Sequence, residues 1–340
     1  EPLGVMVIII PFNYPVDLYS QKVMPALVAG NSVIIKPPSY NPLAIIRMTQ
    51  ILYEAGVPKC AVQVVTGKGR VVGNYLCGHH GINAISMTGS TEVGISIYKK
   101  AADNLTRVFL ELGGNDSFIV LEDADLELAV NEAVGSRMGN AGQICCASKR
   151  FLIHETLKDE FVKKLKEKIN GMKIGDPMDP QTQVGCLISE DAAEQVEKQV
   201  EHCIAQGAIC VTGGKRFGRA FFEPTILDCV TAEMDVAKDM EIFGPVFPII
   251  TIHSEEEAIE IANQSCYGLS GAIFSRNIGR AISIASRLET AGNVINGGSA
   301  YRIPDLAFGG YKKSGIGREG ISRTLEELTQ EKNYILKGVF

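Results

Sequence analysis

Cys145 and Glu111 are the two residues whose types and surroundings could together support nucleophilic catalysis. Cys145 ends the run NAGQIC (140–145), and Glu111 lies in the run LELGG (110–114), where a predicted strand ends. A thiol can serve as a nucleophile and a carboxylate as a general base, and catalytic groups are often placed where elements end. Residue type alone is weak support, because most cysteines are small buried residues and most glutamates are solvated.

A nucleophilic role for Cys145 also requires a suitable environment. An unperturbed thiol with a pKa of about 8.5 is only a few per cent thiolate at neutral pH. A helix end, a cation or a base must therefore lie nearby, and the sequence shows none of these directly.

The run MTGSTEVG (87–94) lies between a predicted strand and a predicted helix. Free backbone N–H groups and the helix dipole favour a phosphate at such a position. The same residues could instead form an ordinary strand-to-helix turn with a Ser or Thr cap. The run is neither a GxGxxG motif nor a Walker loop, so both interpretations stay open.

The composition limits the class of protein. The chain has 340 residues, 46% of them hydrophobic and 21% charged, which is enough for two domains with their own cores. The net charge of -6, with scattered Lys and Arg, predicts a small-molecule partner and binding to neither nucleic acid nor membranes. Nine cysteines without CxxC pairs or zinc-site spacing predict no metal site and favour a reducing compartment. Without a bilayer-length apolar run or a signal-peptide pattern, we expect a cytoplasmic protein.

Strand-like runs alternate with helical patterns along most of the chain, which predicts an α/β fold with a parallel, doubly wound sheet. In the first 120 residues, strands are expected at 5–10, 32–36, 62–66, 83–87 and 107–112, with helices at 17–29, 41–55, 70–77 and 92–102. The second of these helices has Asn41 as its expected cap, Pro42 at its first position and Gly56 at its end.

A second alternating region predicts another α/β domain. Strands are expected at 117–121, 149–153, 246–252, 271–275 and 292–296, with helices at 124–138, 155–170, 190–206, 255–264 and 277–288. A glycine-rich tract at 296–318 precedes a predicted helix at 319–329 and a strand-like end at 334–340.

Seven runs, in order, resemble the NAD(P)-dependent aldehyde dehydrogenase superfamily. They are PFNYP (11–15), KPP (36–38), TGST (88–91), LELGG (110–114), GQIC (142–145), EIFGP (241–245) and FGGYKKSG (308–315). They cover nearly the whole chain. The resemblance implies an aldehyde dehydrogenase-like fold, with a Rossmann-type doubly wound cofactor domain, a second α/β catalytic domain and a short oligomerisation strand.

The resemblance also implies domain boundaries. We expect an N-terminally truncated cofactor-binding domain at 1–112, a catalytic domain at 113–310, a return segment packing on the cofactor domain at 311–330, and an oligomerisation strand at 331–340. A buried strand as early as residue 5 suggests that an N-terminal portion is missing. Pairing of the last strand with a neighbouring subunit would give a homodimer or homotetramer.

For catalysis, the resemblance implies that Cys145 attacks the aldehyde carbonyl to form a thiohemiacetal, which becomes a thioester when hydride leaves. Glu111 then activates water, and Asn13 donates to the oxyanion together with the backbone N–H of Cys145. Lys22 and Glu319 match positions that pass protons to and from the base.

The cofactor implied is NAD(P), and its binding residues follow from the same resemblance. They are Phe12, Lys36, Ser39, Gly67, Gly89, Ser90, Leu112, Glu241 and Phe243. Many NAD-preferring members carry a glutamate at the position of Ser39, where it would repel a 2′-phosphate. A neutral serine beside Lys36 removes that repulsion, so NADP should be tolerated or preferred.

The substrate-anchor loop implied by the resemblance contains Ser299 and Arg302, which could bind a distal carboxylate or phosphate. The chain looks closest to members acting on succinate semialdehyde, although Gly139 stands where several of these carry an arginine. Alternatives are a lactaldehyde or non-phosphorylating glyceraldehyde-3-phosphate dehydrogenase, a CoA-acylating relative, and a non-catalytic binding or structural protein on the same scaffold.

Overall fold

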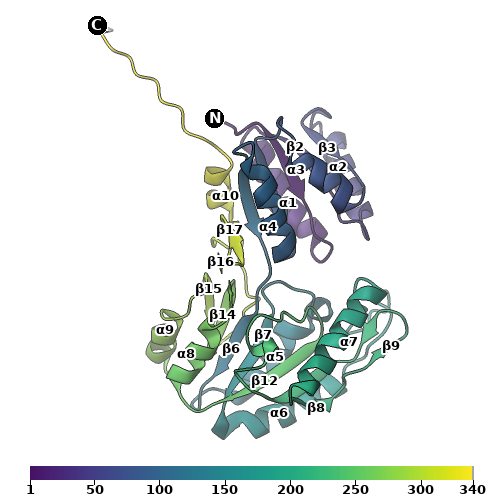
Figure 1. The fold of residues 1–340 in the computed structure, drawn as a ribbon, viewed down its shortest axis with the longest axis vertical. Coiled ribbons are helices and arrows are strands. Elements are labelled where there is room, and N and C mark those ends of the chain that lie inside the picture. The colour runs from purple at the N-terminus through teal and green to yellow at the C-terminus, as the bar shows by residue number, and fades with distance from the viewer. Residues whose placement is uncertain (339–340) are drawn as a thin grey trace. The chain divides into compact units, whose positions relative to one another are not determined.

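The computed structural model describes residues 1–338, which fold as two units (Figure 1). Unit 1 contains Glu1–Glu111, Ile303–Gly309 and the chain from Ile316 onward, and unit 2 contains Leu112–Arg302 and Gly310–Gly315. Each unit has its own sheet and its own apolar core. The predicted α/β class with parallel sheets is therefore confirmed.

Unit 1 is built on a six-stranded sheet of order β17-β5-β4-β1-β2-β3. Its strands are β1 (Val5–Ile9), β2 (Ser32–Lys36), β3 (Val62–Val64), β4 (Ala84–Thr88), β5 (Arg107–Glu111) and β17 (Gly315–Ile316). Strands β1 to β5 pair in parallel. The winding direction reverses between the neighbours β1 and β4, and ligands of open α/β sheets bind outside the carboxyl ends of the strands at such a point.

The helices of unit 1 are α1 (Pro15–Val28), α2 (Leu43–Glu54), α3 (Asn74–Cys77), α4 (Thr91–Ala102) and α10 (Ile321–Glu327), with a π-helical turn η1 (Gly69–Gly73). Helix α1 packs against both α2 and α10, so the late segment that carries α10 is part of this unit. The core beneath α1 includes Tyr19 and Val23, which lie one turn apart and are fully buried.

One predicted helix cap is wrong. Helix α2 begins at Leu43, and Asn41 instead donates its side-chain amide to the carbonyl of Phe12 at 2.9 Å. The predicted end is present, since Gly56 has a φ of 98° immediately after the helix. Asn41 therefore ties the turn after β1 to the start of α2.

Unit 2 is built on a seven-stranded sheet of order β15-β14-β6-β7-β12-β11-β8. Its strands are β6 (Asp116–Val120), β7 (Ser148–His154), β8 (Ile209–Thr212), β11 (Thr225–Val230), β12 (Val246–Ile252), β14 (Ser270–Phe274) and β15 (Gly292–Ile295). All pair in parallel except β8, which is antiparallel to β11. Phe118, Phe151, Phe247 and Phe274 interlock across its four central strands at centroid distances of 4.5–5.1 Å.

The remaining elements of unit 2 are five helices and several short pieces. The helices are α5 (Leu126–Met138), α6 (Glu155–Asn170), α7 (Glu190–Ala205), α8 (Glu255–Asn263) and α9 (Ile278–Ala285), with 3₁₀ turns η2 (Gly139–Gly142) and η3 (Asp235–Ala237). Two-residue strands form the pairs β9 (Arg216–Phe217) with β10 (Phe221–Phe222) and β13 (Tyr267–Gly268) with β16 (Tyr311–Lys312).

The C-terminal segment bears on the predicted oligomerisation strand. Residues 331–338 form neither helix nor strand in this single chain, and residues 339 and 340 lie outside the described residues. Tyr334, Ile335 and Leu336 are exposed. Pairing of this segment with another subunit stays a prediction. Within residues 1–338, no helix has the length and hydropathy needed to cross a bilayer.

Candidate active site

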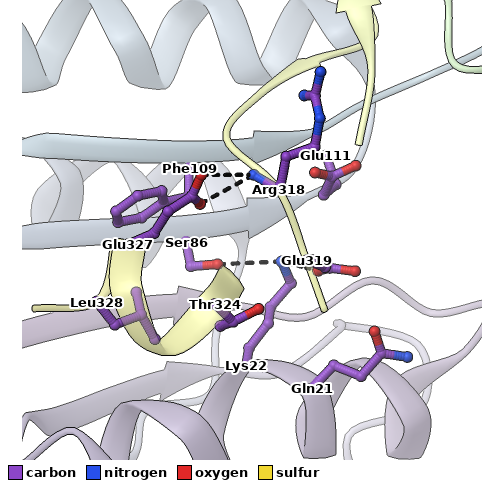
Figure 2. A pocket seen from close by; sticks show the side chains of 10 residues that line it. All are labelled: Gln21, Lys22, Ser86, Phe109, Glu111, Arg318, Glu319, Thr324, Glu327 and Leu328. Carbon is purple, nitrogen blue, oxygen red and sulfur yellow. Dashed lines mark hydrogen bonds and ion pairs between the residues drawn. The ribbon is translucent and has the colours of Figure 1, made fainter. Parts of the chain in front are cut away.

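Unit 1 contains a small pocket that brings together three of the predicted catalytic residues, Lys22, Glu111 and Glu319 (Figure 2). Lys22 reaches from α1 and pairs with Glu319 at 2.7 Å, and its ammonium also donates to the Ser86 hydroxyl at 3.1 Å. The side chains of Lys22 and Glu319 are only 3% and 7% exposed. The complete lining is Gln21, Lys22, Ser86, Phe109, Glu111, Arg318, Glu319, Thr324, Glu327 and Leu328.

The positions of these side chains follow from the local fold. Lys22 lies on the buried face of α1, three residues after Tyr19. Glu111 ends β5 and is buried, and its backbone carbonyl accepts from the N–H of Gly89 at 3.0 Å. Glu319 arrives on the segment before α10, where its backbone exchanges two 2.6 Å hydrogen bonds with Phe308. A buried carboxylate and a buried ammonium can therefore exchange a proton within a shielded site.

Six of the nine residues predicted to bind the cofactor belong to unit 1, where they lie along the carboxyl ends of the strands. Phe12 and Asn13 follow β1, and Lys36 ends β2. The hydroxyl of Ser39 donates to the carbonyl of Gly67 at 3.4 Å, so the turns after β2 and β3 meet. Gly67 has a φ of 147°, and a Cβ there would lie 2.6 Å from Val72 Cγ2, so a side chain would be strained.

Lys36 is a buried cation at this edge. It is 6% exposed, and its ammonium donates to the Pro37 carbonyl at 3.0 Å. Burial lowers the pKa of Lys36, because the charged form is partly removed from water. A phosphate or a ribose oxygen would supply a partner that favours the charged form.

Ser90 caps α4, the 12-residue helix that follows β4. Its hydroxyl accepts from the N–H of Val93 at 3.5 Å, so the capping interpretation of the 87–94 run describes its local geometry. The helix N-terminus still presents backbone N–H groups and a partial positive charge. It follows β4, which lies beside β1 at the point where the winding direction reverses. Together with Lys36, these features fit the pyrophosphate and adenosine ribose of a dinucleotide.

In unit 2, a strained turn leads to Cys145. Asn140, Ala141 and Gly142 have successive positive φ values of 49°, 53° and 79°. Only glycine fits at 142, because a Cβ there would lie 2.2 Å from the carbonyl oxygen of Gly244. Strain of this kind persists only where the surroundings hold it, and it is concentrated at functional sites.

The turn places two adjacent thiols in different environments. Cys145 is partly exposed, whereas Cys146 is buried. Their mutual hydrogen bond and their burial raise the pKa of the Cys145 thiol, while the nearby Lys149 ammonium opposes that rise. The same hydrogen bond lowers the pKa of Cys146, and the charges of Lys149 and Arg302 act in the same direction. The cation that a nucleophilic Cys145 needs is therefore present.

The predicted substrate residues lie beside this cysteine pair. Ser299 is 2% exposed, and its hydroxyl bonds to the Cys146 carbonyl at 2.9 Å and to the Ser148 hydroxyl at 2.8 Å. Through these hydrogen bonds, Ser299 holds the backbone of the cysteine loop in place. Arg302 is partly exposed and close enough for its charge to act on Cys146. It is the better placed of the two to meet an anionic substrate.

Lys149 and Asp116 were not predicted from the sequence. Lys149 is 1% exposed, contacts the Cys145 carbonyl and pairs with Glu241 at 3.2 Å. Asp116, at the start of β6, is also buried, and burial raises its pKa to about 8 against the opposing charge of Lys149. The sequence does contain a signal for a buried charged site. Two adjacent cations, Lys149 and Arg150, stand at the start of a mainly apolar strand, and cations buried there need partners.

Leu112, Glu241 and Phe243 complete the predicted cofactor set, and all three belong to unit 2. Glu241 and Phe243 precede β12, and the N–H of Gly114, on the segment that Leu112 opens, donates to Glu241 at 3.5 Å. Within unit 2 the structure therefore gathers Cys145, Glu241, Ser299 and Arg302, and within unit 1 it gathers Lys22, Glu111 and Glu319. The functional roles of all these residues stay predictions.

Comparison with known proteins gives consistent results. A sequence profile described as the aldehyde dehydrogenase family matches residues 1–334. A lactaldehyde dehydrogenase from Methanococcus aeolicus is 40% identical over 340 residues, which are 99% of this chain and 72% of that protein.

Two crystal structures illustrate the structural likeness. Betaine aldehyde dehydrogenase from Staphylococcus aureus with NAD+ has a TM-score of 0.93 and 39% identity, over 96% of this chain and 66% of that one. A glyceraldehyde-3-phosphate dehydrogenase from Methanocaldococcus jannaschii, complexed with NADP, has a TM-score of 0.93 and 42% identity, over 96% of this chain and 72% of that one. The chain thus spans about two thirds to three quarters of the length of these relatives.

Proposed function

Because the chain belongs to the aldehyde dehydrogenase family, whose members are NAD(P)-dependent enzymes, we propose that it oxidises a short 2-hydroxyaldehyde such as lactaldehyde to the carboxylic acid. The observation that carries the proposed chemistry is the strained turn that presents Cys145 beside a buried cation. The substrate class is supported by the lactaldehyde dehydrogenase with which the chain shares 40% identity. Succinate semialdehyde, the first expectation, gains no such support.

In the proposed mechanism, the Cys145 thiolate attacks the aldehyde carbon and forms a C–S bond, and the carbonyl oxygen becomes an alkoxide. The Asn13 amide and the backbone N–H of Cys145 donate to this oxygen, a contribution typically worth 10²–10³ in rate. A bound nicotinamide would accept the hydride from the former aldehyde carbon, and Cys145 would then carry a thioester.

Hydrolysis of the thioester requires a base. Glu111 takes a proton from water, the resulting hydroxide attacks the acyl carbon, and the acid leaves as the Cys145 thiolate is restored. Lys22 and Glu319 lie in the same pocket as Glu111 and would pass that proton onward. Their burial matters, because a shielded ion pair loses a proton to bulk water less readily than an exposed one.

The predicted cofactor residues would bind different parts of NAD(P). Lys36, Ser39 and Gly67 would contact the adenosine ribose, Ser90 would contact the pyrophosphate, and Glu241 would contact the nicotinamide ribose. No carboxylate occupies position 39, and a relative that is 42% identical was crystallised with NADP. We therefore propose that this protein accepts NADP as well as NAD.

A second candidate substrate is glyceraldehyde 3-phosphate. Arg302 is partly exposed beside the cysteine pair, and an arginine fork matches a phosphate. The M. jannaschii relative carries that substrate in its name. Lactaldehyde and glyceraldehyde 3-phosphate share a 2-hydroxyl next to the aldehyde and differ at carbon 3, which is where Arg302 would discriminate.

The test is a steady-state panel on the purified protein. It compares lactaldehyde, glyceraldehyde 3-phosphate, succinate semialdehyde and simple alkanals, each with NAD and with NADP. We expect the highest kcat/KM for a 2-hydroxyaldehyde, and Cys145→Ala should abolish turnover while leaving cofactor binding largely intact. Undiminished turnover by Cys145→Ala would refute the nucleophile, and a preference for succinate semialdehyde would refute the substrate class.

Assays on the same purified protein distinguish two alternative functions from the proposed one. A CoA-acylating enzyme would need coenzyme A to form product, and Glu111 argues against it because that subclass generally lacks this base. A non-catalytic protein would form no reduced cofactor with any aldehyde. The cytoplasmic location and the homo-oligomeric state are also proposals, and size-exclusion chromatography with light scattering tests the second.

A further inference from the structure

Lys149 is a buried cation whose three contacts all lie in the neighbourhood of the proposed nucleophile. Its ammonium donates to the Cys145 carbonyl at 2.5 Å and to the Ala147 carbonyl at 3.4 Å, and it pairs with Glu241 at 3.2 Å. An ammonium has three donor hydrogens, so these contacts use all of them. Lys149 is only 1% exposed, so bulk water does not compete for these three contacts.

The hydrogen bond from Lys149 to the Cys145 carbonyl affects the orientation of the two thiol side chains. The Cys145 carbonyl belongs to the peptide that joins Cys145 to Cys146, so anchoring that oxygen fixes the orientation of the peptide plane between the two side chains. The preceding turn is strained, with three positive φ values in succession. A strained turn relaxes unless its surroundings hold it, and the Lys149 contact holds its downstream end.

The partner of Lys149 is itself immobilised. The loop of Glu241 is clamped by Arg137, a fully buried residue of α5 that donates to the carbonyls of Ile242 and Val246, at 2.7 Å each. Glu241 also accepts from the N–H of Gly114 at 3.5 Å. Lys149 therefore reaches from a fixed carboxylate to the cysteine loop.

We propose that Lys149 is a positioning residue for the nucleophile, which it serves by anchoring the main chain of Cys145 to the fixed carboxylate of Glu241 and by supplying the positive charge that accompanies the thiolate. The inference rests on the proposed role of Cys145. The titratable and charged groups that face Lys149 are Glu241, Asp116, Cys145 and Cys146. Removal of the ammonium would take away the ion-pair partner of Glu241 and the positive charge that acts on Cys145.

The experiment measures how fast iodoacetamide alkylates Cys145 in the whole chain without cofactor, from pH 6 to pH 10, by mass spectrometry of the Cys145 peptide. An opposite charge nearby typically shifts a pKa by one unit or more. We therefore expect Lys149→Met to raise the midpoint of alkylation by about one pH unit, which slows the reaction about tenfold below the midpoint. Lys149→Arg should retain the wild-type midpoint, since its charge is kept.

Two controls separate this effect from others. Lys158→Met removes an ion-paired lysine of unit 2 whose partners are Asp159 and Asp228, and it should leave the midpoint unchanged. Repeating the series with Asp116→Asn removes a second group that titrates in the same range. Should Lys149→Met fail to fold, Lys149→Gln replaces it, with a donor but no charge.

An unchanged midpoint in a folded Lys149→Met or Lys149→Gln protein would overturn the inference, as would a shift of equal size in Lys158→Met. Failure of the proposed function looks different. In that case Cys145→Ala keeps its dehydrogenase activity, whatever the alkylation of the Lys149 variants shows.

Discussion

Breaking the ion pair between Lys22 and Glu319 by removing one partner should destabilise unit 1 far more than breaking a surface pair does. The side chains of the buried pair are 3% and 7% exposed, whereas those of the pair Arg47 and Glu54 in the same unit are 59% and 61% exposed. Removing one member of a buried pair leaves an uncompensated charge and costs about 3–5 kcal/mol. An exposed pair contributes at most about 1 kcal/mol. Lys22→Met should therefore destabilise unit 1 several times more than Arg47→Met does.

Urea unfolding measures this difference, and cysteine labelling reports it for unit 1 alone. Cys77 is 1% exposed and is the buried cysteine of unit 1, so a short pulse of thiol reagent labels it only when this unit opens. With a slope of about 2 kcal/mol per molar urea, Lys22→Met should lower the labelling midpoint by roughly 1.5–2.5 M. Cys60 is exposed and should label at every urea concentration, as an internal reference.

A double variant completes the test. Lys22→Met combined with Glu319→Gln leaves no unpaired charge in the pocket, so it should recover at least half of the lost midpoint. If Lys22→Met shifted the midpoint no further than Arg47→Met, or if the double variant were as unstable as the sum of the single ones, the assignment of a strong buried pair would be refuted.

Three further predictions concern catalysis, cofactor choice and pH. Glu111→Gln should release about one equivalent of reduced cofactor and then turn over about 10²–10⁴ times more slowly, because the general base that hydrolyses the thioester is lost. Pre-steady-state absorbance measures this burst, and full turnover would dismiss Glu111 as the base. Ser39→Glu should weaken NADP binding at least about tenfold through charge repulsion while sparing NAD, as measured by calorimetric titration, and equal weakening of both would contradict the repulsion argument. The folded-state pKa of Asp116, about 8, lies above its ordinary value of 3.8. Its protonated form therefore favours folding at low pH, and this contribution is lost as pH rises from about 4 to 8. Asp116→Asn should accordingly gain stability relative to wild type over that interval in urea unfolding, and a constant difference would show that Asp116 does not titrate there.

The sequence predicted the parallel sheets because their strands and helices have distinct periods. Strands buried on both faces, such as 5–9 and 246–252, are continuous apolar runs, and the helices between them end at capping residues or glycines. Strands β8 and β11 fall outside the predicted elements. In β11 the apolar run is interrupted by Asp228 and by Cys229, which has a φ of 56°, where the register with β12 shifts.

The candidate site was predictable to the extent that its residues lie in recognisable runs. Cys145 and Glu111 were found in this way, whereas Lys22 lies outside these runs and was predicted from the family position that it matches. The structure places Lys22 with Glu111 in one pocket. Lys149 was not found, because its role depends on which loops meet at the amino ends of β7 and β12. The adjacent cations Lys149 and Arg150 indicate that buried partners are needed, but the identity of the partners depends on the sheet order.

Completion of unit 1 depends on residues from the far end of the chain. Asn31 donates to the carbonyl of Leu328, which lies 297 positions later, and Lys22 meets Glu319 only when that segment returns. During synthesis on the ribosome, the first 111 residues emerge long before this partner exists. The nascent unit must therefore keep an unpaired ammonium and an open sheet edge until all of unit 2 has been translated, and the pocket that contains Lys22 can close only after that.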